Sequence, residues 1–270
     1  MKKYFSELFL KTWRESEAGP AATLARDGSL PVEYRIIVIL VYTSVGITIT
    51  KYFGHTTDFL DQVLVNPSKF DWWYCSFFFG TDIGKFHSML YWVGMIILFY
   101  LVFPVMIVKF VFRDWLSDYG IRLKGIQKDY PLYLLMLAIM LPLVYIASAN
   151  PSFQERYPLF HPAKEPLFPL FFWWQLAYFL QFFAIEFFFR GFMLHGLKYR
   201  FGFYSIFVMT IPYCLVHVGK PFAETMAAIL AGIILGTLSL KSRSIILGVL
   251  IHYSVAISMD LFALWREGWF

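Results

Sequence analysis

Long apolar stretches are the feature that most constrains the fold of this chain. Of its 270 residues, 59% are hydrophobic and 15% are charged, whereas charged residues make up about a quarter of a soluble globular domain. Several stretches reach the roughly 20 residues that a helix needs to cross about 30 Å of hydrocarbon. Their apolar runs are too continuous for the alternating pattern of a membrane β-barrel. The sequence therefore predicts an all-α, polytopic membrane protein.

We expect about seven transmembrane helices, all in a single membrane-embedded domain at residues 35–270. Their predicted ranges are 35–53, 87–112, 130–148, 167–197, 202–217, 223–240 and 244–264. Residues 1–34 mix basic, acidic and apolar side chains, which predicts a cytoplasmic amphipathic segment on the membrane surface. The loop at 54–86 is rich in aromatic residues, which settle at membrane interfaces.

The distribution of Lys and Arg predicts the orientation of the chain. These residues are more numerous in alternate loops, beginning with the N-terminal one. The N-terminus is therefore expected in the cytoplasm and, with seven spans, the C-terminus outside. The net charge of +5 then reflects topology, and no nucleic-acid partner is expected. We expect an integral, multi-pass protein of the bacterial inner (plasma) membrane, surrounded by the lipid bilayer.

Glu186 and Arg190 are two charged residues inside an apolar, aromatic run. An ionisable side chain at the centre of a lipid-facing helix costs at least about 2.5 to 3.5 kcal/mol, so both should face protein. Their spacing of four places them on one helix face, where they can pair. At 1.5 Å per residue, Glu186 lies about 18 Å from the inner end of its predicted span. The pair alone is equally compatible with a structural ion pair and with a catalytic group.

Two histidines occupy later apolar segments. His217 ends the predicted fifth span beside a Gly-Lys-Pro turn, and His252 lies about 12 Å inside the seventh. Each histidine alone is more often a satisfied interhelical hydrogen-bonding group than a catalyst. A carboxylate and histidines beside water are nevertheless sufficient for hydrolysis: the glutamate takes a proton from water, and histidine stabilises the oxyanion or protonates the leaving amine. Together, the three segments predict a catalytic site.

Small residues form a stripe along the predicted sixth span. Ala228, Gly232 and Gly236 follow one another at four-residue steps. Such a stripe allows a neighbouring helix to approach closely. We expect it to be a packing surface.

The three charged or histidine-bearing segments resemble the CAAX prenyl endopeptidase and bacteriocin-processing (CPBP, or Abi) family of glutamic-type intramembrane proteases. That family carries Glu-Glu-x-x-x-Arg on one span, Phe-x-x-x-His on a second and His-x-x-x-Asn, or another small residue in place of Asn, on a third. The matching segments here are Glu186-x-x-x-Arg190, Tyr213-x-x-x-His217 and His252-x-x-x-Ala256. The similarity covers roughly residues 115–264. It implies a metal-free endopeptidase that acts on a membrane-associated protein or peptide.

The chain departs from the family pattern at two positions. Ile185 stands where the family has its first glutamate, usually taken as the water-activating base, and Ala256 stands where it has asparagine. Either the base has moved or the chain is an inactive relative. Glu224, beyond the Gly-Lys-Pro turn, is the candidate for a relocated or second carboxylate. Asp260 is a candidate partner that orients the third-motif histidine, although a polar cap near the outer end of the helix is an equally good interpretation.

The sequence thus predicts an intramembrane endopeptidase that activates water. Its predicted catalytic residues are Glu186, His217, Glu224 and His252, and its predicted orienting residues are Arg190 and Asp260. No cofactor is expected. A zinc-dependent protease stays open because Glu and His are zinc ligands, although the sequence contains no His-Glu-x-x-His motif. An inactive scaffold that binds membrane peptides also stays open, as does a transporter, although no inverted repeat supports the transporter.

Overall fold

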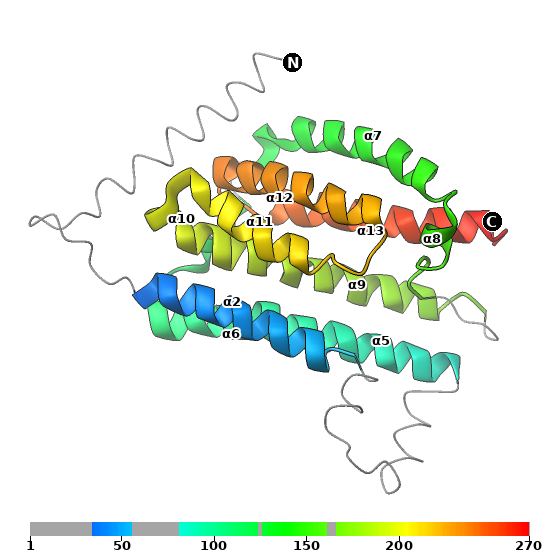
Figure 1. The fold of residues 1–270 in the computed structure, drawn as a ribbon, viewed down its shortest axis with the longest axis horizontal. Coiled ribbons are helices and arrows are strands. Elements are labelled where there is room, and N and C mark those ends of the chain that lie inside the picture. Colours follow the sequence, from blue (N-terminus) through cyan, green and yellow to red (C-terminus); the bar gives the residue numbers. More distant parts are fainter. Residues whose placement is uncertain (1–33, 56–80, 124–125, 161–165, 270) are drawn as a thin grey trace, which may run out of the picture. The chain divides into compact units, whose positions relative to one another are not determined.

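The computed structural model describes residues 34–55, 81–123, 126–160 and 166–269, and these residues form helices and no strand (Figure 1). The α-helices are α2 (Tyr34–Phe53), α5 (Asp82–Ile97), α6 (Phe103–Met106), α7 (Tyr130–Ala147), α8 (Pro151–Gln154), α9 (Leu170–Glu186), α10 (Gly196–Phe201), α11 (Ser205–Leu215), α12 (Phe222–Ser242) and α13 (Ile246–Arg266). The π-helical stretches are η3 (Leu98–Val102), η4 (Ile107–Phe112) and η7 (Phe187–His195). The 3₁₀ turns are η5 (Leu116–Tyr119), η6 (Ile126–Lys128) and η8 (Gly202–Tyr204). The predicted all-α class is confirmed.

Six helical stretches of the described residues are long and apolar enough to cross a membrane, one fewer than predicted. They are Tyr34–Phe53, Asp82–Phe112, Tyr130–Ala147, Leu170–Leu215, Phe222–Ser242 and Ile246–Arg266. Five of them match predicted spans to within a few residues. The difference lies in the predicted fourth and fifth spans, which fall in a single helical stretch of 46 residues.

Gly202 explains how that long stretch is accommodated. Its backbone has φ 53° and ψ −131°, a conformation that is open to glycine and strained for other residues. After this residue the chain forms α11, which packs against η7 and against α12. Helix α11 has only 11 residues, fewer than the roughly 20 that a complete crossing needs. The predicted boundary between the fourth span (167–197) and the fifth (202–217) therefore falls at this break.

The described helices group into two compact units, each built from separate parts of the chain. Unit 1 contains residues up to Ser44, Phe103–Tyr133 and Glu186–Val249; unit 2 contains Val45–Val102, Leu134–Ile185 and Leu250–Phe270. The single membrane domain expected at 35–270 stays a prediction. The predicted surface segment at 1–34 and most of the aromatic loop at 54–86 lie outside the described residues.

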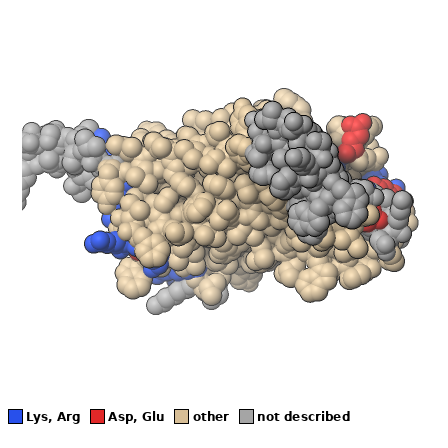
Figure 2. All heavy atoms as spheres, turned by 90° about the horizontal axis from the view of Figure 1, so that it is seen from below, with Lys and Arg blue, Asp and Glu red and all other residues tan. Residues whose placement is uncertain are grey.

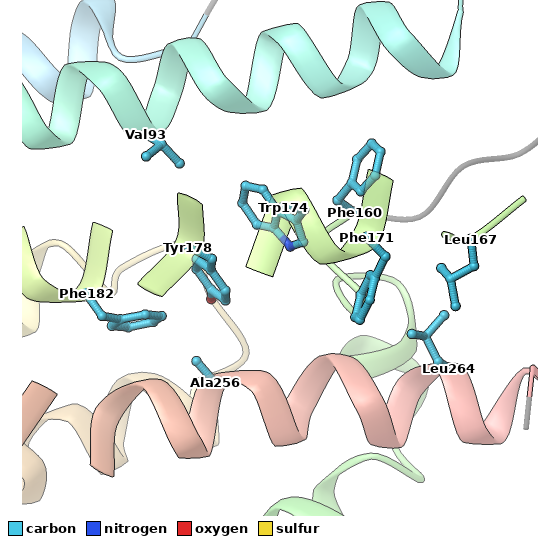
Figure 3. Close-up of a cluster of buried hydrophobic side chains, with 9 residues drawn as sticks. All are labelled: Val93, Phe160, Leu167, Phe171, Trp174, Tyr178, Phe182, Ala256 and Leu264. Carbon is cyan, nitrogen blue, oxygen red and sulfur yellow. The ribbon is translucent and has the colours of Figure 1, made fainter. Parts of the chain in front are cut away.

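Unit 2 has an aromatic core. Figure 3 shows its side chains from α5, α9, α13 and the segment before α9 pointing toward one another. The buried members are Val93, Phe160, Leu167, Phe171, Trp174, Tyr178, Phe182, Ala256 and Leu264. Trp174, Tyr178 and Phe182 follow one another at four-residue steps, and their ring centroids lie 4.9 and 4.7 Å apart. This spacing is typical of rings on one helix face.

Small residues hold the helices of unit 1 close together. A Cβ atom added to Gly232 of α12 would lie 2.8 Å from the hydroxyl oxygen of Thr210 in α11, and one added to Gly236 would lie 3.1 Å from a methyl group of Ile206. Contacts this short leave no room for a larger side chain. The stripe predicted from Ala228, Gly232 and Gly236 is therefore confirmed as a helix-packing surface.

Candidate functional site

The first predicted motif lies where an α-helix changes into a π-helix. Glu186 ends α9, and Arg190 lies in the nine-residue π-helical stretch η7. Extended π-helical geometry is rare and is frequently found at functional sites. Arg190 Nη1 donates a hydrogen bond of 2.9 Å to Glu186 Oε1, and both side chains have no exposed surface. The predicted pairing is confirmed, and the pair is fully withdrawn from solvent and lipid.

Tyr213 of α11 joins this ion pair to the second motif. The Arg190 guanidinium lies 3.9 Å from the centre of the Tyr213 ring, a cation–π contact that is strong when it is removed from water. The ring of His217 lies 4.7 Å from the same ring, at an interplanar angle of 60°. The structure therefore places Glu186, Arg190, Tyr213 and His217 in one continuous set of contacts within unit 1.

The backbone determines which nitrogen of His217 carries a proton. Nδ1 lies 2.8 Å from the carbonyl oxygen of Tyr213. Because a carbonyl oxygen only accepts hydrogen bonds, Nδ1 is the protonated nitrogen, and Nε2 of the neutral ring holds the lone pair. The hydroxyl of Thr225 donates to the backbone oxygen of His217 at 2.9 Å. These contacts orient a half-buried histidine whose Nε2 can accept or deliver a proton.

Glu224 lies on the first turn of α12. Lys220 Nζ donates to its Oε1 at 2.6 Å, and both side chains are partly exposed. Glu224 is also close enough to Tyr213 to interact with it electrostatically. The candidate second carboxylate thus lies near the His217 end of these contacts and is paired with a lysine.

Gly248, on the first turn of α13, provides the space for the other oxygen of Glu186. A Cβ atom added at Gly248 would lie only 2.9 Å from Glu186 Oε2. The helix backbone can therefore approach the carboxylate closely only if this residue has no side chain.

Gly248→Ala is expected to destabilise the protein by about 1 to 3 kcal/mol, because the added methyl group overpacks a buried site. Gly94→Ala is the matched control: Gly94 is also helical, and a Cβ there would meet nothing within 4 Å. The control should be neutral or stabilising by up to about 1 kcal/mol, through higher helix propensity. Thermal unfolding in detergent micelles measures both variants. Equal unfolding temperatures would mean that Gly248 does not crowd the carboxylate.

The third motif belongs to unit 2. The His252 ring lies 4.5 Å from the ring of Phe182. Asp260, eight residues later, is fully buried and accepts hydrogen bonds from the backbone NH of Leu159 at 3.0 Å and from the side chains of Gln175 and Trp174 at 2.8 and 3.4 Å. These donors fix the segment before α9 to α13. They give Asp260 a structural role between these two segments, and its role in orienting His252 stays a prediction.

The two positions that depart from the family pattern lie in apolar surroundings. Ala256 is a buried member of the unit 2 core, and Ile185 packs against the same core. A glutamate at position 185 would place a charge against aromatic side chains, at a large cost in free energy. Isoleucine at this position is therefore consistent with its local packing.

Side chains able to bind a metal are dispersed in the part of the chain that the structure describes. Among those residues, no three or more His, Cys, Asp and Glu side chains are grouped so that they could hold a metal ion.

Sequence reasoning missed three features of this site. These are the stacking of Tyr213 on Arg190, the approach of Gly248 to Glu186 and the π-helical geometry of η7. In the sequence, Tyr213 stands out only because it replaces the phenylalanine of the second motif. Its spacing of four from His217 was the one available signal, because two residues so spaced share a helix face.

Comparison with known proteins agrees with the motif pattern. Residues 167–258 match the model of the family described as type II CAAX prenyl endopeptidase Rce1-like. No curated protein and no solved structure matches the chain. The matched segment contains all three motifs, from the end of the loop before α9 to the middle of α13. Through this segment, which covers about a third of the chain, the protein is similar to the Rce1-like family of CAAX prenyl endopeptidases.

Proposed function

We propose that this protein is an intramembrane endopeptidase that hydrolyses a peptide bond of a membrane-associated protein or peptide. The observation that carries the proposal is the buried ion pair of Glu186 and Arg190, connected through Tyr213 to His217. A charged pair at this depth is costly, and such residues in membrane segments are typically functional. The match to a family of endopeptidases supports the same reaction class.

In the proposed reaction, Glu186 takes a proton from water while the water oxygen adds to the carbonyl carbon of the substrate. Arg190 holds Oε1 of the glutamate, and Oε2 is assigned the role of taking the proton. The proton then reaches the leaving nitrogen through Nε2 of His217, and the carbon–nitrogen bond breaks. The products are a carboxyl group and an amine. Acid–base catalysis of this kind contributes about 10² to 10⁴ in rate.

Two further residues are proposed to complete the site. His252 is assigned the role of stabilising the oxyanion on the basis of its sequence motif. Glu224 is assigned that of a second carboxylate, because it lies within electrostatic range of Tyr213 and beside the turn that follows His217. Arg190 orients Glu186. We propose that the reaction needs no metal, with zinc-dependent cleavage as the alternative.

A catalytically inactive scaffold is the second candidate function. The packing of Ile185 and Ala256 in apolar surroundings favours it, because both positions carry polar residues in the family pattern. Such a protein would bind a membrane-associated peptide without cleaving it.

The proposed setting is the bacterial inner membrane, with the N-terminus in the cytoplasm. The bias of Lys and Arg among the loops supports this orientation. Cleavage of a leader peptide, a surface-protein anchor or a prenylated C-terminus is compatible with such a site.

His217→Ala is expected to abolish the cleavage, with a loss of at least about 10²-fold, because it removes the group that moves the proton. The measurement compares terminal peptides of membrane proteins by mass spectrometry in host cells that carry wild type or variant. His87→Ala, in α5, is the matched control. Elemental analysis of the two purified proteins tests the role of zinc: stoichiometric zinc that is lost in His217→Ala would favour zinc-dependent cleavage. Wild-type processing by His217→Ala would contradict the role of this histidine.

A further inference from the structure

Basic side chains are brought together at one end of unit 1. Two hydrogen bonds join the connection between α12 and α13 to the segment that follows η5. Ser244 Oγ donates to the backbone oxygen of Arg122 at 2.6 Å, and the backbone NH of Ile245 donates to the backbone oxygen of Gly120 at 3.0 Å. Arg243 immediately precedes this connection and is close enough to Lys198 of α10 to interact with it electrostatically. Three cations, Arg122, Lys198 and Arg243, therefore belong to one region of the structure.

Asp118 is close enough to Lys198 to interact with it electrostatically, but it does not form an ion pair with this lysine. Within the part of the chain that the structure describes, the three cations form no ion pair, whereas Arg35 and Lys241 in the same unit pair with Asp114 and Asp129. Lys198 Nζ donates instead to Nδ1 of His195 at 3.3 Å. Because like charges repel, a group in which cations outnumber carboxylates becomes more favourable when an anion binds there.

The backbone of Arg243 adds an independent observation. Arg243 ends α12 with φ 54° and ψ 32°, and Arg113 ends η4 with φ 60° and ψ 33°. No other non-glycine residue among those described has a positive φ. For an L-residue, the equilibrium population of the left-handed conformation is lower by roughly 5- to 30-fold. The favourable interaction of a cation with a helix C-terminus raises that population by only about 2- to 5-fold. Glycine would suit both positions better, so the arginine side chains have a further role.

The surroundings of these arginines are those of a membrane interface. Trp115, Tyr199 and Tyr204 are exposed nearby in the sequence, and Lys109 Nζ lies 4.8 Å from the centre of the Trp115 ring. Exposed aromatic and basic side chains at helix ends are typical of the headgroup layer. Figure 2 shows Lys and Arg side chains gathered at the left end of the view.

We propose that Arg122, Lys198 and Arg243 bind the phosphate of an anionic phospholipid, with Arg113 as a second contact to the headgroup layer. Guanidinium groups bind phosphate through two parallel hydrogen bonds. The phosphate comes from lipid because Arg243 directly follows the membrane-competent helix Phe222–Ser242 and Arg113 directly follows Asp82–Phe112, where headgroups surround the protein. This binding site does not depend on the proposed catalytic activity.

The test measures the thermal unfolding of the purified full chain in a neutral detergent. Phosphatidylglycerol or phosphatidylcholine with identical acyl chains is added. The unfolding temperature of the wild type is expected to rise more with phosphatidylglycerol. Arg243→Gly should lose at least half of this difference while its unfolding temperature in phosphatidylcholine stays equal or rises, because glycine relieves the backbone strain. A purely structural arginine would not give these opposite effects.

Further variants complete the experiment. Arg243→Asn also tolerates the left-handed conformation and replaces Arg243→Gly if that protein does not fold. Arg156→Gln, an exposed arginine of unit 2, is the matched control and should keep the full difference. Equal effects of the two lipids on the wild type, or a full difference in both Arg243 variants, would overturn the proposal. An equal rise with inorganic phosphate would assign the site to soluble phosphate instead and would also overturn it.

Discussion

Changing Glu186 to glutamine is expected to shift a defined set of membrane or surface proteins to their unprocessed form. Glutamine keeps the size of the side chain and its hydrogen bond from Arg190, but it cannot take a proton from water. The loss should be at least about 10²-fold, the lower end of what a general base contributes. Mass spectrometry of N- and C-terminal peptides, in host cells carrying wild type or Glu186→Gln, measures the change and identifies the substrate class.

Glu155→Gln provides the control for that experiment. Glu155 is exposed just after α8, and its replacement should leave all termini unchanged. If no terminus changes in Glu186→Gln cells that contain a normal amount of the protein, catalysis by Glu186 is excluded. The inactive-scaffold function, which the apolar packing of Ile185 supports, would then be preferred.

Arg190→Met should have the largest effect on stability. Methionine roughly preserves the volume, but Glu186 is then a buried charge without its guanidinium, and Tyr213 loses its cation–π contact. Breaking a buried ion pair from one side typically costs about 3 to 5 kcal/mol. Thermal or chemical unfolding in mixed micelles measures the loss. The double variant Glu186→Gln with Arg190→Met should recover a large part of it, because no buried charge remains.

Lys220→Met is the matched control for the buried pair. Lys220 and Glu224 are also four residues apart and 2.6 Å from each other, but 29% and 19% of their side-chain surfaces are exposed. Partly exposed pairs contribute only about 0 to 1 kcal/mol. A similar loss in Arg190→Met and Lys220→Met would show that burial does not determine the cost. Failure of the double variant to recover would show that Arg190 acts mainly through Tyr213.

Local rules predicted several parts of this molecule well. Glu186 and Arg190 pair because a spacing of four leaves two side chains on the same face, in π- as well as α-helical surroundings. Gly232 and Gly236 pack against α11 because only small residues allow two helix backbones to approach closely. The span ends follow from hydrophobic length. Each of these properties depends on residues close together in the sequence.

Other features depend on contacts between distant segments. The predicted break between the fourth and fifth spans falls at Gly202, but hydropathy does not reveal that the short helix after it packs against η7 and α12. That Asp260 orients His252 stays a prediction, made because both lie on one helix. The hydrogen bonds that Asp260 accepts from Leu159, Trp174 and Gln175 come from another part of the chain and could not be read from that helix.

The sequence by itself determined that this protein is an all-helical membrane protein and which segments are the candidates for its chemistry. The free energy gained when an apolar segment leaves water, and the free energy lost when a charge is buried, are properties of a single segment. They can therefore be judged without knowing which other segments pack against it. Only the tertiary structure decided that Arg190 stacks on Tyr213, that Tyr213 holds His217 and that Gly248 makes room for Glu186. These contacts join the end of α9, η7, α11 and α13, and their geometry depends on how the helices pack rather than on any one helix.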